Sequence, residues 1–243
     1  RAIADELAME GCVLVIGSRG AESIGQAASE IMARTGNKVI PVAADVSELD
    51  GCKHLITTAQ REFGRVDILV TNAGGPPAGN LETQGPEVWQ QYTNQTLRSV
   101  VELCRGVVPG MRRRGWGRIL NVTSIAVKQP VDGLGLSNSL RAAVTGFART
   151  LANEVAKDGV TVNNLLPGYT RTDRLDQLAE TLAESRGERP EDVFADWCSQ
   201  IPMGRVGDPK EFAALAAFLA SERASYITGT SIPVDGGWIR SLV

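Results

Sequence analysis

Short apolar runs alternate with longer amphipathic segments along the whole chain. Six runs have the length and β-branched character of strands, namely Cys12–Ile16, Lys38–Val42, Val66–Thr71, Arg118–Val122, Val160–Leu166 and Ser231–Val234. Continuous apolar runs of this kind are typical of parallel strands that are buried on both faces. The pattern therefore predicts an α/β fold, a doubly wound parallel sheet in three layers with helices on both sides.

Two of the intervening segments carry apolar stripes with helical spacing. The members of these stripes are Leu49, Cys52, Leu55, Ile56, Ala59 and Phe63 in the first segment, and Leu140, Val144, Phe147, Leu151 and Val155 in the second. Stripes at this spacing nearly always pack against a core. We therefore assign both to packing and not to a cofactor surface.

The chain reads as a single domain over residues 1–243, because it shows no repeat, no low-complexity linker and no break in composition. One longer polar helical segment, at about residues 173–209, interrupts the alternation of strands and helices. Long excursions in compact domains are often functional. This segment is therefore a candidate lid over a substrate site.

Composition narrows the class of partner. The chain is 43% hydrophobic and 22% charged with a formal net charge of -3, so it has enough apolar material to fold and lacks the basic surface that attracts nucleic acid or anionic lipid. The basic run Arg112–Arg114 follows an apolar helical stretch, and cations are favoured at a helix C-terminus. We interpret it as helix-end placement in preference to a nucleic-acid patch.

Cysteine and histidine usage argues against a metal site. The four cysteines form no CxxC pair and His54 is the single histidine, so neither a zinc site nor a Ser-His-Asp triad is supported. Cys12 and Cys104 lie in apolar runs and are expected to be small core residues, which suits a reducing compartment. No apolar stretch approaches the ~18 residues that span a bilayer, and no signal-peptide pattern is present. We expect a cytoplasmic protein without a membrane partner.

Short motifs follow five of the predicted strands. They are Ser18-Arg19, Asp45-Val46, Asn72-Ala73-Gly74-Gly75, Asn121-Val122-Thr123-Ser124 and Pro167-Gly168-Tyr169-Thr170-Arg171-Thr172. Each is weak alone, but ligands of doubly wound folds bind at the carboxyl ends of the strands. Five motifs in order at these positions form a specific signal.

Together with Ile201–Arg205, Tyr226–Gly229 and Val234–Gly237, these motifs make the chain resemble the classical short-chain dehydrogenase/reductases, and more narrowly their beta-ketoacyl-ACP-reductase-like members. The resemblance runs from Arg1 to about Trp238. It implies a Rossmann-type fold, an NAD(P) cofactor, a small-molecule carbonyl or alcohol substrate, and a homotetramer or homodimer.

The resemblance also implies cofactor contacts. Arg19 matches the position where a basic residue faces the 2′-phosphate of NADP, so NADP is favoured, with NAD as the alternative. Asp45 and Val46 match the adenine contacts. Further cofactor positions fall in two loops: Asn72, Ala73 and Gly74 match the segment on the cofactor ribose, and Pro167, Gly168, Thr170 and Thr172 match the loop that holds the nicotinamide carboxamide.

The catalytic group departs from the family pattern of Asn, Ser, Tyr and Lys. Ser124 matches the serine, but Ser137 stands at the tyrosine position, Arg141 at the lysine position and Thr96 at the asparagine position. A serine hydroxyl is much less acidic than a phenol with a pKa of ~10, and arginine is not a proton relay. Arg141 is expected to hold an oxyanion or the nicotinamide ribose as a permanent cation.

A second departure concerns the glycine-rich turn of the family, which lies between its first strand and first helix and cradles the pyrophosphate. Arg1–Ala4 aligns just after that turn. We therefore expect the given sequence to lack the first strand and the turn. That strand would lie between Cys12–Ile16 and Val66–Thr71, so its absence should leave a gap of ~10 Å.

Two classes of function stay open. The first is an NADP-linked oxidoreductase with a rearranged acid/base group, acting on a carbonyl or alcohol, with a 3-oxoacyl thioester as one candidate substrate and Lys128 as a candidate replacement proton donor. The second is a catalytically impaired homologue that binds the cofactor or serves as a non-catalytic subunit. A nucleic-acid role for residues 112–118 is weaker, because the net charge is negative.

Overall fold

Six parallel strands form the centre of the computed structural model, which describes residues 1–242. The strands are β1 (Leu14–Ser18), β2 (Val39–Ala43), β3 (Ile68–Thr71), β4 (Gly117–Val122), β5 (Val160–Pro167) and β6 (Ser231–Val234). All hydrogen-bonded neighbours are parallel. The six predicted strands are thus confirmed, with boundaries that shift by at most two residues.

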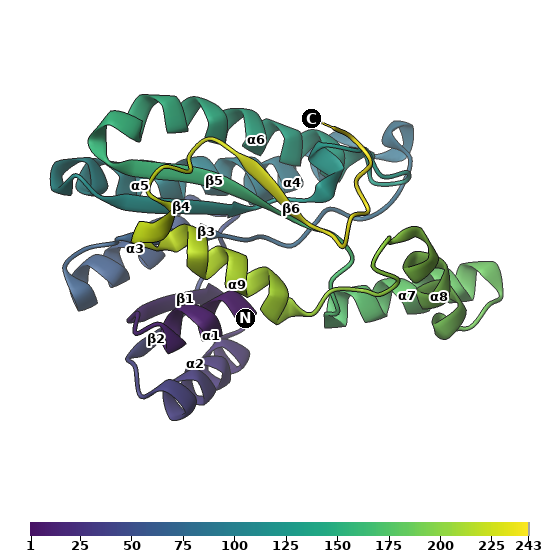
Figure 1. The fold of residues 1–243 in the computed structure, drawn as a ribbon, viewed down its shortest axis with the longest axis horizontal. Helices are drawn as coiled ribbons and strands as arrows, with labels where there is room; N and C mark the ends of the chain where they lie inside the picture. The colour runs from purple at the N-terminus through teal and green to yellow at the C-terminus, as the bar shows by residue number, and fades with distance from the viewer. Residues whose placement is uncertain (243) are drawn as a thin grey trace.

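Helices cover both faces of these strands (Figure 1). The α-helices are α1 (Ala2–Met9), α2 (Ala21–Thr35), α3 (Leu49–Phe63), α4 (Pro86–Thr93), α5 (Ser99–Arg114), α6 (Gly135–Val155), α7 (Asp173–Arg186), α8 (Pro190–Gln200) and α9 (Pro209–Ala220). The short turns are η1 (Leu81–Thr83), η2 (Asn94–Arg98), η3 (Ile125–Val127), η4 (Ala156–Asp158) and η5 (Glu222–Ala224). Buried side chains of α5 and α6 form one core with β4 and β5, while α1 and α9 form a second core on the opposite face. The structure is the predicted three-layer α/β, Rossmann-type domain.

The strands form two separate ladders among the described residues. β1 pairs with β2, and β3, β4, β5 and β6 pair in that order, but β1 and β3 do not pair with each other. β1 and β3, which were expected to flank a missing strand, therefore lie in different ladders.

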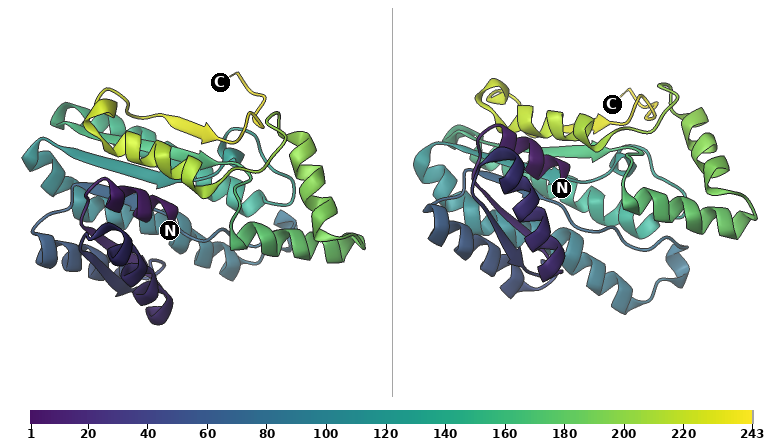
Figure 2. Two further views of the ribbon diagram at one scale, coloured as in Figure 1. Left: turned by 60° about the horizontal axis from the view of Figure 1, so that its bottom comes forward. Right: turned by 90° about the horizontal axis from the view of Figure 1, so that it is seen from below.

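Helices link the two ladders on both faces. On one face, Leu7 of α1 joins the buried core that includes Phe212 and Leu219 of α9, and Figure 2 shows α1 beside α9. On the other face, Leu55 of α3 packs closely against Gly17 of β1, while its neighbour Ile56 packs against the core of α5 and α6.

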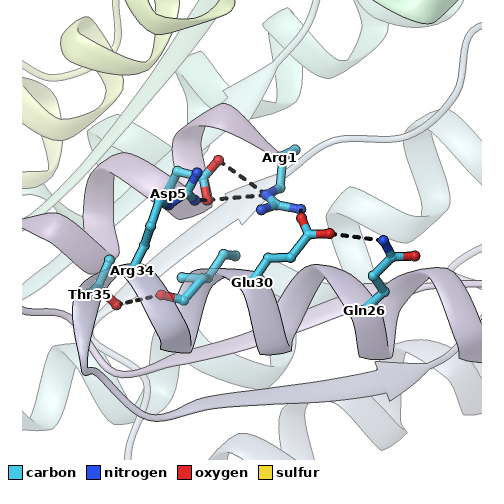
Figure 3. A network of polar contacts seen from close by, with 7 residues as sticks. Arg1, Asp5, Gln26, Glu30, Arg34 and Thr35 are labelled. Atoms are coloured by element: carbon cyan, nitrogen blue, oxygen red, sulfur yellow. Dashed lines mark hydrogen bonds and ion pairs between the residues drawn. The ribbon is translucent and has the colours of Figure 1, made fainter.

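A polar network joins α1 to α2, which pack on the smaller ladder (Figure 3). The Arg1 guanidinium pairs with Asp5 at 3.1 Å and with Glu30 at 3.0 Å, and Arg34 also pairs with Asp5. Gln26 donates to Glu30 at 2.9 Å. These pairs are largely exposed, so each adds little to stability.

The predicted helical segment at 173–209 contains α7 and α8 and ends where α9 begins. Both helices project beyond the carboxyl end of β5 (Figure 1). They pack on each other through a core of their own, which includes Leu175, Ala179 and Trp197. We call α7 and α8 the lid helices, although their role as a lid stays a proposal.

The basic run Arg112–Arg114 lies at a helix end, and His54 lies on a helix, as the sequence predicts. Arg112, Arg113 and Arg114 form the last turn of α5; Arg112 pairs with Asp158 at 2.6 Å, and Arg114 donates to the carbonyl oxygen of Val66 at 2.6 Å. The helix-end interpretation is therefore confirmed. His54 is exposed on α3.

Cys104 is buried, and its burial raises the pKa of the thiol to about 12. Cys12 is only half-buried. No helix within residues 1–242 is long and apolar enough to cross a membrane.

Candidate active site

The first turns of α6 face the carboxyl end of β4, and Arg141 joins the two. Its Nε donates a hydrogen bond to Oγ of Ser137 at 3.2 Å, one helical turn earlier. Its Nη1 donates to the carbonyl oxygens of Thr123 at 2.7 Å and Val122 at 3.2 Å. Because Ser124 follows Thr123 directly, Arg141 holds α6 against the strand end that carries Ser124.

The guanidinium of Arg141 is not fully used by these bonds. An arginine has five N–H donors, and the three bonds involve only Nε and Nη1. The remaining Nη2 lies 3.6 Å from the point where a Cβ on Gly75 would stand, so it faces the loop after β3. No hydrogen bond or ion pair to Nη2 occurs within residues 1–242. Two N–H donors are therefore available to a ligand.

The charge of Arg141 is also unmatched. No carboxylate of the described residues lies within 4.0 Å of its side-chain nitrogens, and burial lowers the pKa of the guanidinium from its ordinary value. Removing a cation from water without a partner is costly, because the lost hydration is not replaced by an opposite charge. The site therefore favours a ligand group that is negatively charged or becomes so.

Ser137 bonds Arg141 directly, and Ser124 follows Thr123, whose carbonyl oxygen accepts from Arg141. Ser124 has an extended backbone at the start of η3, and its Oγ accepts a hydrogen bond from the Ala126 amide at 3.1 Å. Ser137 is 8% exposed, and its Oγ accepts from Arg141. Neither hydroxyl donates to an acceptor within residues 1–242, so both can donate to a ligand oxygen. The arrangement can hold an oxyanion, but it offers no acid comparable to a phenol.

Tyr169, which follows Gly168, packs against two tryptophans. Its ring stacks on Trp197 of the lid helices, with centroids 5.0 Å apart, and meets Trp238 edge-on at 6.1 Å. Burial, with a smaller effect of the nearby Asp196, raises the pKa of the phenol. Tyr169 therefore belongs to an aromatic cluster at the base of the lid helices.

Sequence reasoning placed Thr96 at the family's asparagine position but missed what surrounds it. Thr96 lies in η2, a π-helical turn, where it is 5% exposed and its hydroxyl has no hydrogen-bond partner in the described chain. The preceding Gln95 donates to the carbonyl oxygen of Gly74 at 2.6 Å. Such π-turns often mark functional sites, yet no residue pattern reveals one in advance. Gln95 is thus a positioning residue for the loop after β3 that only the structure shows.

Arg19 and Asp45 lie at the adjacent ends of β1 and β2. Ser18 and Ala43 are paired in the ladder, so the residues that follow them emerge side by side. Arg19 is exposed, and its guanidinium makes no hydrogen bond or ion pair within residues 1–242. Asp45 accepts from the hydroxyl of Ser47 at 2.7 Å and from its amide at 2.9 Å. These bonds, with a smaller contribution from the charge of Arg19, lower the pKa of Asp45.

The loop after β5 is held by close backbone contacts. A side chain on Gly168 would stand 2.7 Å from the Cα of Asp235, so only glycine fits. Thr170 forms a bridge with Gly207. The hydroxyl of Thr172 caps α7 by accepting from the Leu175 amide at 3.3 Å. Thr172 thus already has a structural task, whatever it contributes to a ligand.

The sequence-predicted residues form three groups in the structure. Ser124, Ser137 and Arg141 meet at the end of β4 with Gly75 opposite; Arg19, Asp45 and Val46 lie at the ends of β1 and β2; and Pro167, Gly168, Thr170 and Thr172 form the loop after β5. Asn72, Ala73 and Gly74 precede Gly75 after β3. Lys128 is exposed after η3. No group of three His, Cys, Asp or Glu side chains in residues 1–242 is placed to hold a metal ion.

Two of these residues, Arg141 and Arg19, have free donors that suit groups of a dinucleotide cofactor. The free Nη2 donors of Arg141 face the Gly74–Gly75 backbone, and a ribose hydroxyl is a suitable acceptor for them. The unpaired guanidinium of Arg19 is free to bind a phosphate.

Comparison with known families supports the same picture. The model of the family described as enoyl-(acyl carrier protein) reductase matches residues 1–239. The chain is 35% identical to the 3-oxoacyl-[acyl-carrier-protein] reductase FabG of Vibrio harveyi over 98% of this chain and 91% of the relative. It is 34% identical to the dehydrogenase/reductase SDR family member 4 of Oryctolagus cuniculus over 97% of this chain and 87% of the relative.

Solved structures share the fold closely. L-sorbose reductase from Gluconobacter frateurii, solved as a complex with NADPH and L-sorbose, superposes with a TM-score of 0.95 at 35% identity and covers 99% of this chain and 92% of its own. YwfH, an NADPH-dependent reductase involved in bacilysin biosynthesis, superposes with a TM-score of 0.94 at 31% identity and covers 99% of this chain and 94% of its own.

Proposed function

This chain belongs to the short-chain dehydrogenase/reductase family of oxidoreductases, and on that premise we propose that it transfers a hydride between NADP(H) and a small carbonyl or alcohol substrate. The observation that carries the proposal is the junction of α6 with β4, where Arg141 bonds both Ser137 and the carbonyl oxygen of Thr123, the residue before Ser124. When bound, a reduced nicotinamide supplies the hydride. The side chains of this chain bind and orient the carbonyl and stabilise its oxygen.

The donors at this junction suit the developing charge on a carbonyl oxygen. As hydride adds to the carbonyl carbon, the oxygen becomes anionic, and the Ser124 and Ser137 hydroxyls are free to donate to it. Arg141 donates to Ser137 and so polarises that hydroxyl. The proton that completes the alcohol comes from solvent water, because neither serine is acidic enough to supply it readily. We therefore expect the proton step to limit the rate with simple ketones.

The preference for NADP(H) rests on Arg19. Its exposed guanidinium has no protein partner in the described chain and stands beside Asp45 at the ends of β1 and β2. Binding a phosphate there would form charge-assisted, bidentate hydrogen bonds. NADH, which lacks the 2′-phosphate, would leave the guanidinium in water.

Cofactor titration of the purified chain tests this proposal. We expect NADPH to bind more tightly than NADH by about tenfold or more, and Arg19→Ala to remove that difference. Arg61→Ala is the control, because Arg61 is an exposed arginine on α3 whose one ion pair among the described residues is with its neighbour Glu62. Equal binding of both cofactors by the unaltered protein would refute the role of Arg19, and binding of neither by the full-length protein would refute the proposed function.

Turnover is tested separately with a panel of neutral and charged carbonyl compounds. The names of the relatives make 3-oxoacyl thioesters the first class to assay, beside sugars and quinones. The second candidate function is a cofactor-binding homologue without catalysis. The specific observation that favours it is Ser137 in place of an acidic phenol. Tight NADPH binding with no turnover on any compound would favour this candidate.

The proposal also covers the oligomeric state of the protein and its location in the cell. The likeness to the family leads us to propose a homotetramer or homodimer in the cytoplasm. Light scattering of the purified chain measures the mass of the assembly, and a monomer at micromolar concentration would contradict this part.

A further inference from the structure

A cavity of about 300 Å³ lies between the C-terminal ends of α3 and α5. It is at the end of the sheet where β3 and β4 begin, whereas the candidate active site is at the end where β4 stops. β4 has six residues and spans about 20 Å, so the cavity is remote from the cofactor contacts at the carboxyl ends of the strands.

Two glycines on one face of α5 shape this cavity. A Cβ on Gly106 would stand 2.2 Å from the side chain of Ile56, so α3 and α5 are in close contact there. Gly110 lies one turn later on the same face and also has no side chain, so the space beside it stays open. The lining includes the buried Val107, so the cavity extends down to the core.

Three arginines converge on the cavity. Arg113 and Arg114 follow Gly110 by three and four residues, which places them on the same face of α5. A Cβ on Gly110 would stand 3.1 Å from Nη1 of Arg114 and 4.0 Å from Nη2 of Arg113, so both guanidinium groups reach back to this glycine. Arg65, which follows the end of α3, belongs to the opposite wall.

These three cations are only partly neutralised. Asp67 pairs with Nε of Arg65 at 2.9 Å and with Nη2 of Arg114 at 3.5 Å. Arg113 makes no hydrogen bond or ion pair within residues 1–242. Nη1 of Arg114 and both terminal nitrogens of Arg65 have no hydrogen-bond acceptor in the same residues. The cavity therefore has an excess of two positive charges and unused N–H donors on both walls.

The neighbouring carboxylates are engaged elsewhere. Glu62 pairs with Lys38 at 3.0 Å and with Arg61 at 3.1 Å. Asp158 pairs with Arg112 at 2.6 Å. The last carbonyl groups of α3 and α5 contribute about half a negative charge each, which leaves the cavity positive. Because like charges repel, this local excess of cations is unfavourable until an anion binds.

We propose that this cavity binds a diphosphate group, either the free anion or one carried by a small molecule. Guanidinium groups bind phosphate oxygens through paired, charge-assisted hydrogen bonds. The side-chain amide of Gln60, which has no partner within residues 1–242, adds a neutral donor. Two phosphate groups match the excess of two positive charges, and a volume of about 300 Å³ suits a small ligand and not a nucleic-acid duplex.

Titration of the full-length protein with inorganic pyrophosphate tests the site. Saturating NADPH is present so that the cofactor positions are occupied, and the ionic strength is held at about 0.15 M, where charges more than about 8 Å apart are screened. We expect calorimetry to show saturable binding of one pyrophosphate per chain. ADP is titrated in parallel. Comparable affinity would show that the site admits a diphosphate with an organic group attached, and weaker binding that it takes the free anion; both results support the site.

Two variants assign the binding to the cavity. Arg113→Ala removes a cation that has no protein partner and should weaken binding by about tenfold or more, since hydrogen bonds to charged groups are the stronger kind. Its control is Arg105→Ala, which changes the net charge equally, because Arg105 is an exposed arginine of α5 that pairs with Glu102 at 3.0 Å.

The second variant, Gly110→Leu, keeps every charge and fills the cavity, so it should also weaken binding by about tenfold or more. Its control is Gly25→Leu in α2, because a Cβ on Gly25 would meet nothing within 4 Å. Both controls should leave the affinity for pyrophosphate unchanged.

Three results would overturn the proposal. The first is the absence of saturable binding by the unaltered protein. The second is equal weakening by Arg113→Ala and Arg105→Ala, which would show diffuse attraction by net charge. The third is unchanged affinity in a folded Gly110→Leu protein. None of these residues takes part in the proposed reduction. If the protein binds no cofactor, the reductase function fails, but titration without NADPH and the same variants still decide the anion site.

Discussion

The two sides of the candidate site are held in different ways. On the core side, Arg141 bonds α6 to the backbone carbonyls of Val122, the last residue of β4, and Thr123, which follows it. On the lid side, α7 and α8 have their own small core, into which Tyr169 of the loop after β5 packs, and further contacts lie at the surface. Among these, Arg171 pairs with Asp176 at 2.9 Å and lies 4.2 Å above the ring of Phe194. The residues proposed for chemistry are therefore tied to the main sheet, whereas the proposed lid helices have a core of their own that we expect to loosen more readily.

The largest expected effect comes from changing the chemistry on the core side. Ser137→Tyr combined with Arg141→Lys restores a phenol and an amine at the spacing of the family. General acids contribute about 10²- to 10⁴-fold, so we expect turnover of neutral ketones to rise by roughly a hundredfold. Steady-state kinetics with methyl acetoacetate measures it.

Ser137→Phe with Arg141→Lys is the control, because it adds the ring without the hydroxyl. An equal gain in that control would show that ring packing, and not proton donation, limits the rate.

The next largest effect concerns the polar row beneath the core side. Thr71, Asn121, Asn164 and Ser231 occupy paired positions on four neighbouring strands, and their side chains bond at 2.8, 3.2 and 3.1 Å in turn. Asn121→Leu removes both side-chain hydrogen bonds of Asn121. It leaves its two buried partners, Thr71 and Asn164, without the groups they bond in the unaltered protein. We expect a loss of about 2 kcal/mol in the free energy of unfolding, measured with urea.

Thr57→Val is the control for the polar row, because its hydroxyl bonds only to backbone carbonyls on the exposed face of α3. If Thr57→Val lowers the free energy of unfolding by a comparable amount, the effect of Asn121→Leu cannot be assigned to the polar row.

A smaller and more local effect is expected on the lid side. Trp197 stacks on Tyr169 and meets Phe194 edge-on at 5.2 Å. Trp197→Ala should loosen α7 and α8 and raise KM about tenfold with little change in kcat, because the lid core is separate from the other cores.

We expect Trp197→Ala to speed up amide hydrogen exchange within residues 173–200 and not elsewhere in the domain. Exchange that also rises across β4 and β5 would show that the lid helices and the domain unfold together.

The smallest effect is pH-dependent and lies where the lid segment meets α9. Arg205 pairs with Glu211 at 2.6 Å, and the Asp208 amide donates to the same carboxylate at 2.8 Å. Together they lower the pKa of Glu211 from 4.5 to about 2. Because the folded pKa is depressed, this stabilisation is present above pH 4.5 and is lost as the pH falls toward 2.

Glu211→Gln should therefore lower Tm slightly at pH 7 and converge with the unaltered chain near pH 2 to 3. Thermal melts across pH 2–7 measure the difference, with Glu87→Gln as the control because Glu87 forms no ion pair in the described residues. A difference in Tm that is constant with pH would contradict this assignment.

Residue pattern was enough to predict the six strands, because buried parallel strands require continuous apolar runs between turns. It also placed Ser137 and Arg141 on one face of a helix, since residues four apart in an α-helix lie on the same side. The aromatic packing of Tyr169 and the link from Gln95 to Gly74 could not be predicted, because each joins residues at least 21 positions apart.

The sequence by itself determined the residue types at the site, and with them the absence of a phenol at position 137 and the presence of a permanent cation at 141. Only the tertiary structure decided how that cation is used. It shows which of the five N–H donors are occupied, and that no protein carboxylate among residues 1–242 balances the charge. The physical reason is that charge and hydrogen-bonding capacity belong to a side chain, whereas their compensation depends on which distant groups the fold brings within a few ångströms.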